Sequence, residues 1–306
     1  MASVRSSEES GERMLLRPQQ PYSYEETIRR LVSFEKTAYR SEGGKLYRTL
    51  RLSKRPVVVE LEWEEEKSAL AATVDTELDD RERMDLERIL RRMFSLDVNL
   101  APFYESIKME PRLAQVVEER KGLHFVLDPT LYECLIKTII GQQLNMAFAA
   151  KLVDRLIHLA GERLERAGEV LAVFPTPEQV ARLRYEDLQA LQFNRRKAEY
   201  VIDLSRRIAE GKLNLDELHR LEDQEVVGRL LPLRGIGRWT AECLLLFGMG
   251  RPNLLPAADI GLRNAVRRVY ELDAQPTEKE VRQMGEAWSP WRSYATFYLW
   301  DTLSGQ

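Results

Sequence analysis

Residues 231–266 read LPLRGIGRWTAECLLLFGMGRPNLLPAADIGLRNAV, and this stretch places two glycines one residue apart just before a helical pattern. Glycine tolerates a positive φ, so the chain can reverse tightly there and its backbone can come close to another molecule. The first N–H groups of a helix have no partner within the helix and carry partial positive charge. Gly235 and Gly237 therefore predict an anion site at the helix start. Arg234 and Arg238 flank it, so phosphate is the expected anion. A plain corner between two helices fits the glycine spacing equally well.

The charge of the chain is unevenly distributed. The 306 residues carry a formal net charge of −3, which by itself argues mildly against nucleic acid as a partner. Between Arg229 and Arg268, however, seven arginines stand against two acidic residues, while acidic residues concentrate between Glu60 and Glu87. A local basic face can therefore bind a polyanion although the total charge is acidic.

Composition excludes several other classes of protein. No run approaches the ~20 apolar residues that span a membrane, and the Ser/Glu-rich first residues lack the apolar segment of a signal peptide. The two cysteines, Cys134 and Cys243, lie in apolar helical patterns, which excludes a disulfide framework or a cysteine-rich metal cluster. The three histidines are scattered and stand in no metal-binding motif. We therefore expect a cytoplasmic protein with no membrane partner.

The N-terminal third predicts a small α+β domain. After a disordered tail over 1–14, helical patterns at 22–35 and 81–96 enclose runs with strand-like alternation. We expect an antiparallel sheet with two helices and place this domain at 15–104. The predicted strands cover 45–52, 56–64 and 68–76.

Strand signals vanish after about residue 100, and the rest of the sequence indicates helices. Asn and Asp caps and glycine stops mark about ten of them, including a helix expected over 176–191. No repeat at a fixed period points to a solenoid. We therefore predict a mostly α-helical region over 105–306.

The order and spacing of residues 231–266 resemble the helix-hairpin-helix plus Gly/Pro…Asp motif of base-excision DNA glycosylases. That motif needs a GxG hairpin, a Thr-Ala pair, a helix that ends at glycine, a proline, and an aspartate at a helix start. In this sequence these positions are held by Gly235, Gly237, Thr240, Ala241, Gly248, Pro256 and Asp259.

Further stretches at 139–156, 174–181 and 288–300 resemble the 3-methyladenine DNA glycosylase II branch of this family. The N-terminal domain is similar to the sheet domain of that branch, which resembles one half of the TATA-binding protein. The resemblance implies an α+β fold in which this sheet domain precedes a helical helix-hairpin-helix region. It also implies that the helical region has two subdomains with the active-site cleft between them.

The resemblance assigns the chemistry to Asp259. From the residues alone, Asp259 is an N-terminal helix cap, which is a frequent role of aspartate. In the family, the aspartate at this position faces the sugar of a nucleotide that has left the base stack, so capping and catalysis can coexist. A fixed carboxylate stabilises the positive charge that develops on the sugar as the base departs. It can also orient or deprotonate the attacking water.

Trp239 stands where bifunctional family members hold a lysine whose amine attacks the sugar. Since there is no amine here, the resemblance implies a monofunctional enzyme that uses water and leaves an abasic site. Trp239 and Trp300 are expected to face each other across the base pocket, where aromatic faces attract a cationic alkylated purine. Cys243 and Ile260 replace aromatic residues of the relatives and are expected to line the same pocket.

Other residues are expected to contact the DNA. The family fills the gap left by the flipped base with a wedge residue, and here that position reads Gln143, with Leu144 next to it. Either side chain is a candidate. At the hairpin, the residues expected to contact the strand are Arg234, Gly235, Ile236, Gly237, Arg238 and Thr240.

Family members also hold a monovalent cation under the hairpin through main-chain carbonyls. By position these would be the carbonyls of Leu231, Leu233 and Ile236. The resemblance therefore implies a structural Na⁺ or K⁺ ion and no other cofactor.

Functions of two classes fit these features. The first is a monofunctional DNA glycosylase that flips alkylated purines, such as 3-methyladenine or 7-methylguanine, out of duplex DNA and hydrolyses their glycosidic bond in base excision repair. The second is a helix-hairpin-helix module that binds DNA without catalysis. A glycosylase for other damaged bases is the alternative within the enzyme class. We expect double-stranded DNA as the partner of a monomer that works at the bacterial nucleoid.

Overall fold

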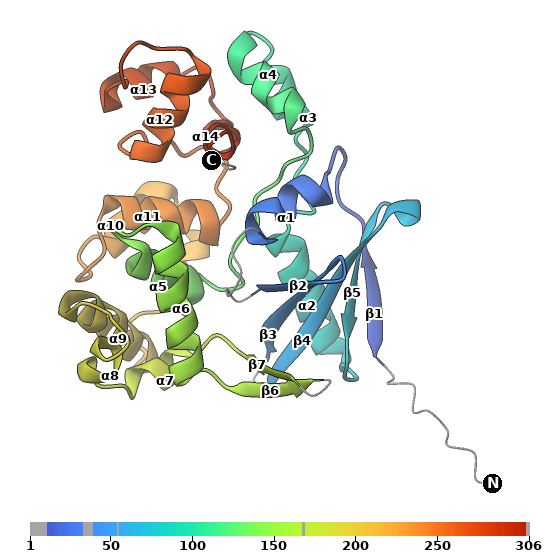
Figure 1. Cartoon of the computed structure of the whole chain (residues 1–306), viewed down its shortest axis with the longest axis vertical. Helices are drawn as coiled ribbons and strands as arrows, with labels where there is room; N and C mark the ends of the chain where they lie inside the picture. Colours follow the sequence, from blue (N-terminus) through green and yellow to red (C-terminus); the bar gives the residue numbers. More distant parts are fainter. Residues whose placement is uncertain (1–10, 33–38, 54, 167–168, 304–306) are drawn as a thin grey trace.

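The computed structural model describes residues 11–32, 39–53, 55–166 and 169–303 (Figure 1). An antiparallel sheet lies on one side of the molecule and a large helical region on the other, as the predicted α+β class requires. No helix in these ranges is long and apolar enough to cross a membrane.

Five strands form the sheet in the order β1-β5-β4-β3-β2, with every neighbouring pair antiparallel. The three strands predicted from the sequence are present as β3, β4 and β5. The sequence-based prediction of a disordered tail through residue 14 is wrong for residues 12–14, which pair with β5, and residues 1–10 lie outside the described part. The strands are β1 (Glu12–Leu16), β2 (Tyr39–Glu42), β3 (Lys45–Leu52), β4 (Arg55–Glu64) and β5 (Ala69–Val74).

One face of the sheet shares a hydrophobic core with helix α2 (Asp80–Met93). Side chains in a strand alternate between faces, so Val57, Val59 and Leu61 of β4 all enter this core. Helix α2 starts with a capping box in which Asp79 and Glu82 each accept from the other's backbone N–H. The helical pattern at 22–35 corresponds to α1 (Tyr24–Val32). A short 3₁₀ turn, η1 (Glu65–Lys67), joins β4 to β5.

Buried polar contacts join the sheet domain to the helical region. Arg48 of β3 donates two hydrogen bonds, of 2.6 and 2.7 Å, to the buried carboxylate of Glu133. The hydroxyl of Thr49 donates to the carbonyl oxygen of Ala172 at 3.0 Å. A buried carboxylate needs such a partner, because removal of its counter-ion leaves an uncompensated charge.

The helical region differs from the prediction in two places. Strands β6 and β7 form a hairpin that pairs Arg163 with Ala172, although no strand was expected after residue 100. The single helix expected over 176–191 is two short helices, because Arg184 is extended and caps the second one. The elements are α3 (Ala101–Ser106), α4 (Pro111–Glu119), α5 (Leu131–Gly141), α6 (Met146–Ala160), β6 (Arg163–Arg166), β7 (Glu169–Ala172), α7 (Pro177–Ala181), α8 (Tyr185–Gln189), α9 (Arg195–Ala209), the 3₁₀ helix η2 (Asp216–Arg220), α10 (Asp223–Leu230), α11 (Arg238–Cys243), the π-helical η3 (Leu244–Gly248), α12 (Ile260–Val269), α13 (Glu278–Met284) and α14 (Arg292–Asp301).

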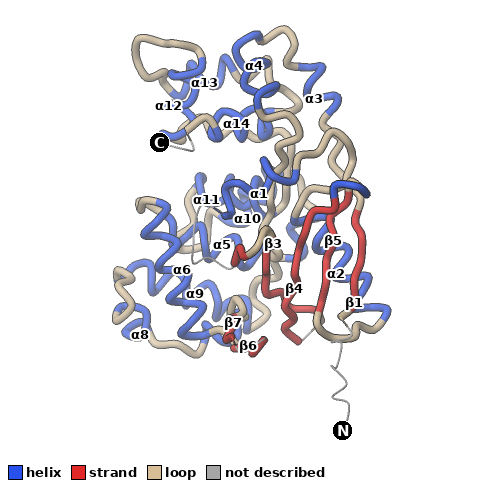
Figure 2. The backbone as a smooth tube through the Cα atoms, turned by 45° about the vertical axis from the view of Figure 1, so that its right-hand side comes forward, coloured by secondary structure: helices blue, strands red, loops and turns tan. Residues whose placement is uncertain are grey.

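These helices pack around two hydrophobic cores. One core is built mainly by α5 to α11, and the other by α12 to α14 together with α3 and α4, which precede α5 in the sequence (Figure 2). Phe247 packs against both cores, so it lies where the two groups of helices meet. Trp288 is completely buried and packs in the second core.

Truncation of Leu86 tests the packing of α2 on the sheet. Leu86 is 0% exposed, so Leu86→Ala is expected to lower the free energy of unfolding of the sheet domain by roughly 2–5 kcal/mol through lost burial and a cavity. Met84 lies on the same helix but is 72% exposed, so Met84→Ala is expected to change the free energy of unfolding by less than about 0.5 kcal/mol. Chemical denaturation followed by circular dichroism measures both, and equal effects would contradict the packing described here.

Candidate active site

The turn between α10 and α11 contains the two glycines, and they have different structural roles. Gly235 has φ +87°, and a Cβ placed there would lie 2.3 Å from Cγ of Tyr200. Conformation and packing therefore both require glycine at this position. Gly237 has φ −98° and caps α11, and a Cβ there would meet nothing within 4 Å. The fold does not need glycine at 237, so its bare backbone is free to receive a molecule from outside.

A glutamine that sequence reasoning missed holds the hairpin in place. Nε2 of Gln142 donates to the carbonyl oxygen of Gly235 at 2.8 Å and to the hydroxyl of Thr240 at 2.9 Å. The ammonium group of Lys197 donates to the carbonyl oxygens of Ile140 and Gln142, at 2.7 and 2.6 Å. The pKa of Lys197 is lowered by burial. The end of α5 is thereby fixed against both the hairpin and α9.

Two of the hairpin side chains expected at the DNA are buried. Thr240 is 1% exposed and its hydroxyl faces Gln142, so it braces the hairpin rather than presenting a side chain to a strand. Ile236 belongs to the first hydrophobic core. Only its backbone is in a position to reach a ligand, because its side chain points into the protein.

Both arginines beside the hairpin are exposed, and both have carboxylate partners. Arg234 pairs with Glu199, and its guanidinium lies 5.5 Å from the ring centre of Tyr200. Arg238 donates to Glu242 at 3.0 Å, one helical turn further on. The guanidinium groups are exposed while the side chains of Glu199 and Glu242 are only 12% exposed, so a phosphate can approach the arginines from the solvent side.

Asp259 is the N-cap of α12, as predicted, and it is half-buried. Its Oδ1 accepts the N–H of Leu262 at 2.7 Å and the indole Nε1–H of Trp300 at 2.9 Å. Among the described residues, these hydrogen bonds reach Oδ1 and not Oδ2. A Cβ at position 261 would lie 3.0 Å from Oδ1 of Asp259 and 3.5 Å from Nε1 of Trp300. Gly261 therefore provides the space in which the indole meets the carboxylate.

The residues expected to line the base pocket have unequal exposure. Cys243 is buried, and burial together with the charges of Asp259 and Glu242 raises the pKa of its thiol to about 12. Ile260 is 65% exposed and Trp239 is 39% exposed. Trp239 and Trp300 make no ring contact in the described structure, so their facing each other across a pocket stays a prediction.

Phe247 is a further aromatic residue at the site that sequence reasoning missed. Its ring stacks on Trp300 with a centroid distance of 6.0 Å and an angle of 21°. Its position after the hairpin, inside the apolar run LLLFG, reads as core packing. The stack fixes the indole face that lies against Phe247.

The two candidate wedge residues lie in different environments. Gln143 is exposed and has φ 56°, a conformation that side-chain-bearing residues seldom adopt. Leu144 is half-buried and packs against the first core. Gln143 is thus the side chain at the free tip of the loop between α5 and α6.

Comparison with known proteins finds similarity to DNA repair proteins in a family model, in sequence relatives and in solved structures. The family model described as "HhH-GPD superfamily base excision DNA repair protein" matches residues 136–290. The protein YfjP of Bacillus subtilis (strain 168), named as a candidate DNA-3-methyladenine glycosylase, is 42% identical over 219 residues, which are 72% of this chain and 75% of the relative.

Two solved structures are also similar. A 3-methyladenine DNA glycosylase from Archaeoglobus fulgidus is 27% identical with a TM-score of 0.82, over 94% of this chain and 97% of that one. The 3-methyladenine DNA glycosylase Mag1 of Schizosaccharomyces pombe, in complex with abasic DNA, is 28% identical with a TM-score of 0.55, over 66% of this chain and 96% of that one.

Alanine at each hairpin glycine separates their two roles. Gly235→Ala is expected to cost roughly 1–3 kcal/mol of stability, because it combines a left-handed backbone with a collision against Tyr200. Gly237→Ala is expected to stay within about 0.5 kcal/mol of the wild type, because its added methyl group meets open space. Thermal unfolding distinguishes them, and equal melting temperatures would show that the hairpin geometry is wrong.

Proposed function

This chain belongs to the HhH-GPD superfamily of base excision DNA repair proteins, and from that premise we propose how it works as a DNA glycosylase for alkylated bases. Its partner is DNA. The substrates that we propose are 3-methyladenine and 7-methylguanine in duplex DNA, which the enzyme hydrolyses as a monomer to leave an abasic site.

The observation that carries this proposal is the fixation of Asp259. Two hydrogen-bond donors, on Leu262 and Trp300, hold Oδ1, and the partly exposed carboxylate keeps Oδ2 for a ligand. As the glycosidic bond lengthens, the sugar gains oxocarbenium character, and a preorganised anion next to it stabilises that charge. The same oxygen can orient the water that attacks the sugar, or take up its proton.

An alkylated purine needs little further help to leave. Alkylation at a ring nitrogen makes the base cationic, so it departs as a neutral molecule and needs no partnered general acid. Trp239 and Trp300 are the aromatic faces that we propose for holding this cation. Neither carries an amine, so a Schiff-base intermediate cannot form on them, and the reaction ends at the abasic site.

The hairpin and the loop after α5 are proposed to hold the distorted DNA. The open backbone at Gly237 and the first N–H groups of α11 face a phosphate, and Arg238 gives up Glu242 to join them. Gln143 is the proposed wedge, because it is exposed at the loop tip while Leu144 packs inward. A glutamine there fills the gap by stacking and can also hydrogen-bond the opposite base.

We also propose a monovalent cation at the hairpin. The carbonyls of Leu231, Leu233 and Ile236 supply neutral oxygen ligands within the turn, which suit Na⁺ or K⁺. The carbonyl of Leu233 already accepts the N–H of Ile236 at 3.1 Å, and its second lone pair remains for an ion. When bound, such an ion would add positive charge next to the phosphate site.

Removal of the charge at Asp259 tests the catalytic assignment. Asparagine caps a helix as well as aspartate does, so Asp259→Asn keeps α12 but loses the anion. We expect single-turnover release of 7-methylguanine from methylated duplex DNA to fall by at least roughly 100-fold, with DNA affinity retained. The matched control is Asp79→Asn, at the N-cap of α2, which should keep full activity.

Activity of Asp259→Asn close to that of the wild type would contradict this mechanism. A wild-type protein that binds methylated DNA but releases no base would instead favour a DNA-binding module without catalysis.

Introduction of lysine at position 239 tests why the enzyme is monofunctional. Trp239 is 39% exposed, so a lysine there would keep an ordinary pKa of about 10.4 and stay protonated at neutral pH. Trp239→Lys is therefore expected to form no covalent adduct with DNA when borohydride is added during the reaction. A trapped adduct would show that the site already activates an amine at this position.

A further inference from the structure

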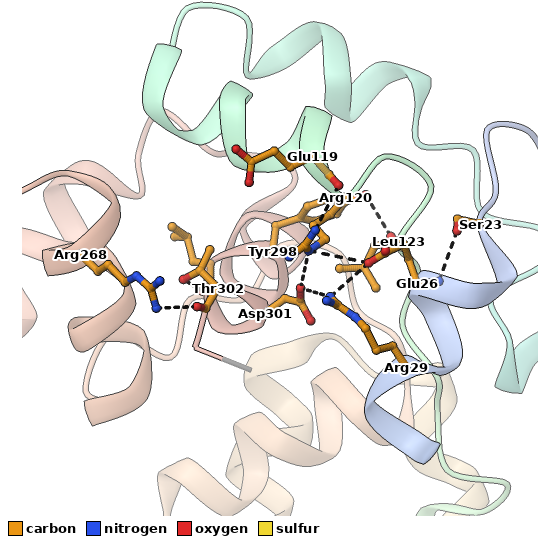
Figure 3. Close-up of polar contacts among 11 residues, drawn as sticks. Ser23, Glu26, Arg29, Glu119, Arg120, Leu123, Arg268, Tyr298, Asp301 and Thr302 are labelled. Carbon is orange, nitrogen blue, oxygen red and sulfur yellow. Dashed lines mark hydrogen bonds and ion pairs between the residues drawn. The ribbon is translucent and has the colours of Figure 1, made fainter. Parts of the chain in front are cut away.

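The end of α14 that carries Trp300 is held by two ion pairs, one from the end of α4 in its own group of helices and one from α1 in the sheet domain. Asp301, the next residue, has a fully buried carboxylate whose Oδ2 accepts from Arg29 of α1 and, at 3.1 Å, from Nε of Arg120 (Figure 3). Arg29 belongs to the sheet domain, so a side chain more than 270 positions away in sequence reaches the residue next to the indole.

The two arginines are themselves fixed. Glu26 is on the same helix as Arg29. Its Oε2 lies 3.1 Å from Nη2 of Arg29 and 3.7 Å from Nε of Arg120. Helix α1 is also tied to the segment after α4, because the hydroxyl of Thr27 accepts the N–H of His124 at 3.2 Å. Other contacts of α1 and of the segment after α4 therefore hold both cations in place.

A second contact holds the chain one residue beyond Asp301. Nη1 of Arg268, in α12, donates to the carbonyl oxygen of Thr302 at 2.8 Å (Figure 3). Within α14, the hydroxyl of Tyr298 donates to the carbonyl oxygen of Leu123 at 3.1 Å. The helix turn with the indole is thereby restrained by α12, by the 120–124 segment and by the sheet domain.

The ion pair is not explained by the stability of α14 alone. A carboxylate at the last residue of a helix meets the negative end of the helix dipole, and burial adds a desolvation cost. The cations of Arg29 and Arg120 offset both costs only while Asp301 stays where they can reach it. The arrangement therefore favours one position of the helix end, and the indole of Trp300 follows from that position.

We propose that Asp301 and Arg29 are positioning residues of the glycosylase reaction. They fix the end of α14 so that the indole of Trp300 meets both Asp259 and the flipped base, which makes the sheet domain part of the active site. This proposal rests on the function proposed above for Asp259 and Trp300. The carboxylate of Asp301 is fully buried and therefore out of reach of DNA, and Arg29 pairs with it, so both residues act through Trp300.

A double-mutant cycle tests this route of action. Asp301→Asn keeps the side-chain shape and removes the charge that Arg29 and Arg120 hold. We expect single-turnover release of 7-methylguanine to fall roughly 10- to 100-fold, because a small misplacement of a binding group has effects of this size. Affinity for duplex DNA with an abasic-site analogue should stay within about twofold. In a Trp300→Ala background, the same substitution should cause no further loss.

The matched control is Glu133→Gln. Glu133 is also buried and also pairs with an arginine of the sheet domain, but it lies on α5 in the first core. We expect Glu133→Gln to lower the melting temperature, because it removes a buried charge pair. The rate of excision at 25 °C should change by about twofold or less, and by the same factor in the Trp300→Ala background. Arg29→Gln provides a second variant if Asp301→Asn does not fold, since Arg120 still pairs with Asp301.

Two results would overturn the proposal. One is wild-type excision in the folded Asp301→Asn and Arg29→Gln variants. The other is a loss in Asp301→Asn that persists in full when Trp300 is absent, which would mean a general effect on the fold. A wild-type protein that releases no alkylated base would contradict the proposed function itself. This failure is distinguishable from the two above, because in both of those the wild-type protein is active.

Discussion

Two hydrogen bonds that meet at Oδ1 of Asp259 are the contact on which the site depends. One donor, the N–H of Leu262, is local to the helix start, and the other, the indole of Trp300, lies 41 positions further along the chain. A carboxylate held from two directions does not rotate freely, so the axes of α12 and α14 determine where its second oxygen points. The absence of a side chain at Gly261 lets the two groups approach, which makes a glycine as important to the carboxylate as its hydrogen-bond donors.

The architecture sets the distance between the carboxylate and the hairpin. The hairpin belongs to the first hydrophobic core and Asp259 caps a helix of the second, while Phe247 packs against both and stacks on Trp300. Interiors of proteins pack densely and resist compression, so the separation of the two groups is fixed before any DNA arrives. In the function proposed above, such preorganisation would leave the binding energy for the deformation of the DNA and the release of a nucleotide from the stack.

Local signals could be predicted from the sequence, and contacts between distant segments could not. The N-cap at Asp259 and the positive φ at Gly235 are encoded within a few residues and are confirmed, whereas the same expectation for Gly237 is wrong, because its φ is −98°. Thr240 was expected to contact DNA, but it is buried and its hydroxyl accepts a hydrogen bond from Gln142, 98 positions earlier, which no local pattern indicates. Strand β1 was missed because Glu12 and Arg13 resemble a charged tail, and only pairing with β5 orders them. Both features depend on contacts between segments far apart in the sequence, and a local sequence pattern does not indicate such contacts.

Burial of both cysteines has a consequence for an enzyme that works where electrophiles attack DNA. Thiolates react with alkylating agents far faster than thiols do. Burial raises the pKa of Cys243 to about 12 and that of Cys134 well above its usual range, so both stay protonated at neutral pH. The sulfur atoms thus offer the methylating agents that damage the substrate almost no nucleophile. Neither cysteine therefore competes with the DNA bases for a methylating agent.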